Sequence, residues 1–213
     1  MHSKYLSDGD ILNMEAQYRA AFMNSLTGFK SASLIGTIDK NKNINLSIFS
    51  SVTHLGSNPA LIGFISRPNI TERHTLENIL ETKYYTINHI NKNIFKQAHQ
   101  TSARYPKNIS EFDATGLTPE FITGISAPYV KESFIKYGVE YVEKHELKIN
   151  NTILIIGKVI QAIVPEYCLL QDGAIDIEKA ETITISGLDS YHTSNKIAKL
   201  SYAKTDKMPV EIN

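Results

Sequence analysis

The chain is poor in several features that would restrict its class immediately. It has one cysteine among 213 residues, Cys168, so an intrachain disulfide cannot form. No H-x-H, H-E-x-x-H or C-x-x-C spacing involves the seven histidines or Cys168, which argues against a metal site. We therefore expect a reduced, cytoplasmic protein with no bound metal. Cys168, beside the apolar Leu169 and Leu170, is expected to be a packed core residue.

Net charge and long apolar runs are also missing. The 22 Lys and Arg residues balance 22 Asp and Glu residues, so no broad positive field is available to bind nucleic acid or a membrane surface. The longest apolar run, 152–165, is interrupted by Gly157, Lys158 and Gln161 and is too short to span a bilayer. The first residues lack the basic start and the apolar stretch of a signal peptide.

Composition otherwise fits an ordinary globular protein, with 42% hydrophobic and 21% charged residues and no repeat. We expect one domain over residues 1–213, with a helical extension at 1–29 and a tail at 193–213. Strand patterns dominate, at 31–39, 44–52, 60–66, 84–90, 137–149 and 151–164. The last of these is apolar enough to be covered on both faces.

Short helical patterns lie between and before these strands, at 14–26, 75–83 and 93–103. At least six strands with few helices predict a mainly β (α+β) fold, a closed or nearly closed β-barrel with peripheral helices. The helices are too few for a doubly wound parallel sheet.

A polar cluster, "RPNITERHTLENI", marks the passage from a strand to a helix. If Thr71 or His74 begins this helix, its free N–H groups and dipole form a pocket suited to phosphate. The side chains that could add hydrogen bonds are Arg67, Arg73, His74, Thr75 and Asn78. The alternative is a simple helix cap with solvent-facing neighbours, which spacing alone favours because polar helix starts are common.

Hydroxyl groups are concentrated in a second stretch, residues 45–64. Ser47, Ser50, Ser51 and Thr53 fall in a run otherwise suited to a buried strand. Hydroxyls inside a core need hydrogen-bond partners, which a ligand could supply. A strand with one solvent-facing side explains the serines more simply when this stretch is taken alone.

Together these stretches resemble the flavin reductase-like proteins, FMN-binding split β-barrels that include flavoredoxin. The similarity rests on "NLSIFS", "SNPAL", Arg67, "RHTLENI" and the pair Ile87-Asn88, in that order. It continues in "AHQTSARYPKNISEFDATGLTPEF" and "APYVKES". Three positions depart from the family pattern: Ser47-Ile48 replaces A-P, Ala60 replaces a proline, and His74 replaces the usual Asp.

The resemblance implies an FMN site. One group would line the isoalloxazine and ribityl chain: Asn45, Ser47, Ile48, Phe49 and Ser50. A second group would hold the phosphate: Arg67, Arg73, His74, Thr75 and Asn78. Ala98 and Ser102 fall where the family approaches the cofactor, often across a dimer interface, so a homodimer is expected.

The implied activity is NAD(P)H-dependent reduction of flavin, a small molecule or a protein acceptor through bound FMN. No side chain has to act as the catalytic group, because flavin N5 accepts the hydride. The chain has no G-x-G-x-x-G and no Walker A sequence, so NAD(P)H would bind without a Rossmann unit. His99, Tyr191 and His192 are substrate-side candidates, although surface or packing roles explain them as well. A non-catalytic FMN carrier and a barrel without cofactor are the alternatives.

Overall fold

The computed structural model describes residues 2–68 and 74–212 and is mainly β. An antiparallel sheet of seven strands forms its body, in the order β3-β2-β6-β9-β10-β5-β4. The strands are Ser33–Ile38 (β2), Ile44–Phe49 (β3), Thr53–Ser57 (β4), Ala60–Ser66 (β5), Tyr84–His89 (β6), Lys136–Leu147 (β9) and Thr152–Ile163 (β10).

Chain connectivity forces this sheet to curl. β3 and β4 lie at opposite edges of the sheet, yet only residues 50–52 separate them. Such a link spans roughly 14 Å at most, whereas seven flat strands would be roughly 29 Å wide. The edges therefore approach each other without pairing, which makes a split β-barrel. The Ser51 hydroxyl fixes the corner by accepting from Ile65 N–H (3.0 Å) and donating to Ile65 C=O (3.3 Å).

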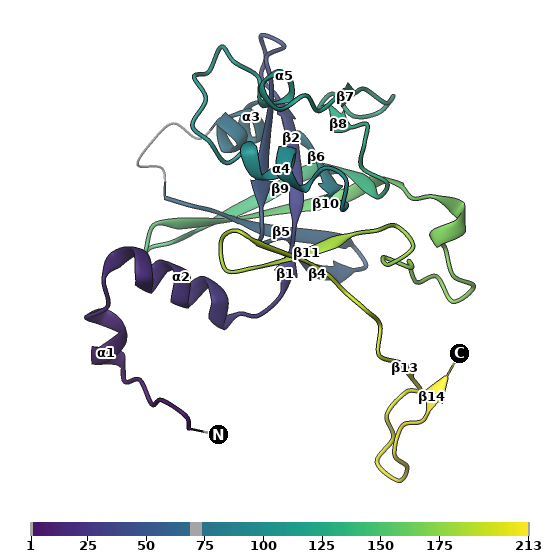
Figure 1. Ribbon diagram of the computed structural model, residues 1–213. Coiled ribbons are helices and arrows are strands. Elements are labelled where there is room, and N and C mark those ends of the chain that lie inside the picture. The colour runs from purple at the N-terminus through teal and green to yellow at the C-terminus, as the bar shows by residue number, and fades with distance from the viewer. Residues whose placement is uncertain (1, 69–73, 213) are drawn as a thin grey trace.

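The core consists of two main apolar clusters, one on each side of β2 and β3. One contains Ile35, Phe64, Tyr85, Ile155 and residues of helix α3 (His74–Thr82). The other lies beneath helices α4 (Phe95–Gln100) and α5 (Glu111–Thr115) and contains Leu34, Leu46, Ile90, Ala98 and Phe112. In Figure 1 these three helices gather at one end of the barrel.

Smaller elements complete the fold. A second sheet joins β1 (Lys30–Ser31), β11 (Ile183–Ser186) and β12 (Ser190–Thr193). Two short pairs are β7 (Pro119–Glu120) with β8 (Tyr129–Val130), and β13 (Lys199–Leu200) with β14 (Glu211–Ile212). A short 3₁₀ helix spans Glu166–Cys168. Helices α1 (Asp8–Leu12) and α2 (Ala16–Leu26) bury no residue and project from the barrel, as the β13–β14 hairpin does (Figure 1).

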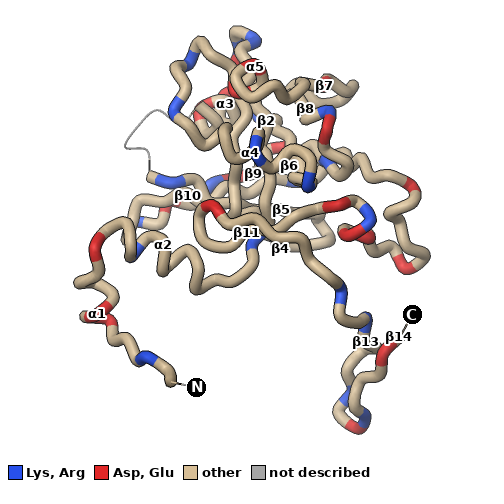
Figure 2. The backbone as a smooth tube through the Cα atoms, viewed as in Figure 1, with Lys and Arg blue, Asp and Glu red and all other residues tan. Residues whose placement is uncertain are grey.

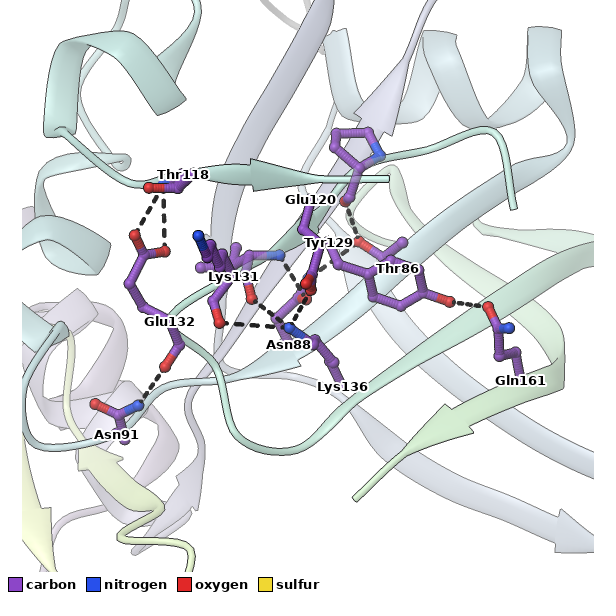
Figure 3. A network of polar contacts seen from close by, with 12 residues as sticks. Thr86, Asn88, Asn91, Thr118, Glu120, Tyr129, Lys131, Glu132, Lys136 and Gln161 are labelled. Atoms are coloured by element: carbon purple, nitrogen blue, oxygen red, sulfur yellow. Dashed lines mark hydrogen bonds and ion pairs between the residues drawn. The ribbon is translucent and has the colours of Figure 1, made fainter. Parts of the chain in front are cut away.

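The long segment between α5 and β9 is tied down by buried polar groups (Figure 3). Lys136 is 6% exposed, and its ammonium donates to Glu120 Oε2 (2.5 Å) and to the carbonyl of Val130 (3.2 Å). The Thr86 hydroxyl donates to the carbonyl of Pro128 at 2.6 Å. These bonds fix the segment against β6 and β9. Charges of both signs are interspersed over the whole fold (Figure 2).

The sequence-based expectations for the fold are largely confirmed. All six predicted strands are present, and Cys168 is fully buried. The expectation that β10 is covered on both faces is wrong. Its residues alternate between buried and more exposed because a barrel wall has one inner face. Strand β4 was not expected, because its short sequence "THLGS" shows no alternation of apolar and polar residues. In the structure this strand is mostly exposed.

Candidate functional site

Strand β3 carries the "NLSIFS" motif and lies at an open edge of the barrel. Within the described residues it is hydrogen-bonded to a strand, β2, on one side only. The Leu46 N–H turns away from β2 and donates to Glu111 Oε2 at 3.0 Å. Backbone direction alternates along a strand, so Ile48 turns its N–H and C=O to the same open side. The edge therefore offers backbone donors and acceptors to a ligand.

The side chains of this segment pack on the two faces of the strand rather than along its edge. Phe49 packs inward against Phe64, with ring centroids 5.0 Å apart. Ile48 packs against the apolar cluster on the other side of the strand. Ser47, Ile48, Phe49 and Ser50 are all half-buried.

Arg67 lies at the barrel corner where β3 and β5 both end. The Ser51–Ile65 hydrogen bonds bring these two strand ends together, and Arg67 follows β5 directly with an exposed side chain. Burial, and then the nearby positive charge of Arg67, lower the pKa of Lys30. The corner is therefore cationic. Arg73 and Thr71 lie outside the described residues.

Within the described residues helix α3 spans His74–Thr82 and presents Thr75 and Asn78 inward. Asn45 Nδ2 donates to Thr75 Oγ1 at 3.0 Å, and Asn78 Nδ2 donates to Thr37 Oγ1 at 3.1 Å. A small cavity of about 10 Å³, roughly the room for one water, is lined by His74, Asn45, Asn78 and Glu111 among others. The structure thus brings together four of the predicted residues, Asn45, His74, Thr75 and Asn78. That they contact a phosphate stays a prediction.

The remaining predicted residues lie around α4 and β12. Ala98 is fully buried in the core, whereas Ser102 is exposed just after the helix. His99 Nδ1 and the Tyr191 hydroxyl are 3.0 Å apart, and burial raises the pKa of Tyr191 to about 12. His192 does not join this pair, because its Nε2 contacts the Ser186 hydroxyl at 2.8 Å.

Sequence reasoning missed two residues of the site. Thr37 is fully buried in β2 and receives the Asn78 amide, but a lone threonine in a strand pattern gives no signal. Glu111 is 7% exposed, and burial raises its pKa. Its position within "SEF", part of the stretch that resembles the family, was the available clue.

Fold and site together define a split β-barrel protein with an open strand edge beside a cationic corner. Residues 29–174 match the family model described as "Flavin reductase like domain". The chain belongs to this flavin reductase-like family, as its motifs predicted.

Three similar proteins accompany this match. A candidate flavin reductase with a split barrel domain from Shewanella frigidimarina NCIMB 400 is 53% identical, with a TM-score of 0.91 over 94% of this chain and 100% of that one. An uncharacterised Aquifex aeolicus protein is 25% identical over 70% of this chain and 76% of its own length. The flavoredoxin of Desulfovibrio vulgaris (Miyazaki F) is 23% identical, with a TM-score of 0.69 over 84% of this chain and 91% of its own.

Family membership supports a flavin-related oxidoreductase function with a flavin cofactor. Among residues 2–68 and 74–212, none of the helices is both long and apolar enough to cross a bilayer.

Proposed function

We propose that the protein is an FMN-dependent oxidoreductase that takes hydride from NAD(P)H and passes electrons to free flavin, a small molecule or a protein. The open edge of β3 is the observation that supports this most directly. The pyrimidine end of an isoalloxazine alternates C=O acceptors with an N–H donor, which an unpaired strand edge can match. Residues 47–50 would supply that edge, with Asn45 at its start.

The phosphate end would lie at the cationic corner. Arg67 is exposed there, and Arg73 and His74 are close to it in sequence. A guanidinium binds a phosphomonoester through paired, charge-assisted hydrogen bonds. Thr75 and Asn78 would contribute at the first turn of α3. FMN therefore fits this site better than riboflavin, which has no phosphate.

Bound flavin would supply the redox chemistry, and the chain's role is to bind, orient and shield it. Ser47 and Ser50 are half-buried beside the edge and would orient the ring. NAD(P)H would approach the exposed ring face, because the chain has no Rossmann fingerprint. His99 and Tyr191 would lie on the substrate side, since Tyr191 packs against the same apolar cluster as Ile48. His192 would contribute there only if its contact with Ser186 opens.

A homodimer would complete this arrangement, with the flavin site near the interface. Helix α2 and the residues next to it expose Tyr18, Met23, Leu26 and Phe29 without burying any helix residue. Ser102 and the α4 segment around Ala98 would then face the second copy. Light scattering should show a dimer at micromolar concentration, and a monomer with flavin bound would contradict this.

The decisive experiment mixes the purified protein with FMN and then with NADH or NADPH under anaerobic conditions. Loss of the oxidised flavin band at a rate dependent on protein supports the reductase. Bound FMN that neither nucleotide reduces indicates an electron carrier instead. Arg67→Gln should weaken FMN binding roughly tenfold but leave riboflavin binding unchanged, because only the phosphate contact is lost. Equal losses for both ligands would remove Arg67 from the phosphate site.

A further inference from the structure

Glu111 is a buried carboxylate that the proposed chemistry does not use. It is the first residue of α5 and is 7% exposed. Burying a carboxylate is costly unless hydrogen bonds compensate it. Here the compensation includes a backbone group, because Oε2 accepts the Leu46 N–H of strand β3 at 3.0 Å.

The short helix α5 holds this carboxylate in place. The Ser110 hydroxyl caps the helix by accepting from Phe112 N–H at 3.3 Å, and the Phe112 ring is fully buried in the core. Gly116 ends the helix with a left-handed φ of 72°. With both helix ends fixed, the Glu111 side chain reaches β3 from a defined position.

The contact falls immediately before the proposed ring-binding residues 47–50. Asn45, the residue before Leu46, is held from the other direction through Thr75 of α3 at 3.0 Å. Two successive residues of β3 are thus fastened to two helices. The strand can then leave the outer edge of residues 47–50 without a second strand partner and still not fray.

We propose that Glu111 is a positioning residue that takes the place of a neighbouring strand at Leu46 and keeps the edge of β3 straight and open for flavin. A carboxylate can accept the edge N–H but cannot extend the sheet, so it also blocks pairing with another strand. The role of Glu111 in flavin binding rests on the proposed function, whereas its hydrogen bond with Leu46 N–H does not.

Three variants separate the hydrogen bond from the charge. Glu111→Gln keeps an oxygen at the same reach, so its FMN dissociation constant should stay within about threefold of wild type. Glu111→Ala removes the acceptor and should raise that constant roughly tenfold. Glu111→Asp keeps the charge but is one methylene shorter, so it should resemble the alanine variant. Asp113→Asn, on the same helix and exposed, is the matched control and should change nothing.

Hydrogen exchange supplies a readout that general destabilisation would not reproduce. In Glu111→Ala, and in Glu111→Asp if the alanine variant does not fold, the Leu46 amide should exchange at least tenfold faster. Amides of the β9–β10 pair should keep their wild-type rates. Uniform acceleration, or unchanged exchange at Leu46, would overturn the assignment. Two results for FMN binding would also overturn it. One is a wild-type dissociation constant in both Glu111→Ala and Glu111→Asp, and the other is a Glu111→Gln variant that binds FMN as weakly as Glu111→Ala.

Failure of the proposed function gives a different result. In that case wild-type protein shows no FMN binding, while Leu46 exchange still depends on residue 111. The edge-holding contact would then stand, and its role in flavin binding would be refuted.

Discussion

Gly36→Ala tests the close packing on which the β2–β3 hairpin depends. Gly36 lies in β2, paired with Leu46 of β3 on one side and Thr86 of β6 on the other. A Cβ at this position would lie 2.2 Å from the Pro128 carbonyl oxygen and 2.7 Å from the Thr86 hydroxyl. These two atoms are themselves hydrogen-bonded at 2.6 Å, so the methyl group must separate them.

The expected cost follows from two terms. Overpacking a close-packed interior costs about 1–3 kcal/mol, and a buried carbonyl that loses its donor costs about 1–3 kcal/mol more. The alanine recovers about 0.5–1 kcal/mol of chain entropy. The midpoints of these ranges sum to about 3 kcal/mol, so we expect the free energy of unfolding to fall by about 2–4 kcal/mol. In a chain of this size the melting temperature should drop by roughly 5–15 °C.

Urea unfolding followed by circular dichroism measures this loss directly. Gly9→Ala in the exposed helix α1 is the control, because the nearest atom to its Cβ is 3.8 Å away. Thr86→Val removes the same hydrogen bond, so the double variant should lose less than the sum of the single losses. A Gly36→Ala protein as stable as the control, or strict additivity with Thr86→Val, would refute the reasoning.

Three further predictions concern stability. Burial lowers the pKa of His89 to about 4, so the unfolded chain binds the proton first and stability falls as pH drops from about 6.5 to 4. The loss should reach about 3 kcal/mol, and His89→Gln should flatten the curve of unfolding free energy against pH; an unchanged curve would contradict the burial argument. Lys136→Met leaves the Val130 carbonyl and Glu120 without their donor and should cost about 3 kcal/mol by urea unfolding. Lys144→Met, an exposed pair with Glu146, is its control and should cost under about 1 kcal/mol. Gly157→Ala would place a Cβ 2.4 Å from both the Tyr85 hydroxyl and Val139 Cγ1 and should cost about 2 kcal/mol in calorimetry. In Tyr85→Phe, which removes one of these two close contacts, the same change should cost less, and an equal cost would rule out a contribution from the hydroxyl.

Local sequence determined the strands and their turns. Two β-prone runs, 31–39 and 44–52, are separated by the polar turn "KNKN", and this pattern predicted the β2–β3 hairpin. The burial of Cys168 followed in the same way from its apolar neighbours. The order of motifs from "NLSIFS" to "APYVKES" placed the chain in its family.

Tertiary structure decided which strand is an edge and what holds it there. β3 and β4 are neighbours in sequence, and no local pattern reveals that they lie at opposite edges of the sheet. Closure depends on the pairing of all seven strands at once, through contacts distant in the chain. The Glu111–Leu46 hydrogen bond joins residues 65 positions apart, so it exists only after the barrel has formed. Sequence therefore supplied the candidate site residues, and folding supplied the open strand edge beside which several of them lie.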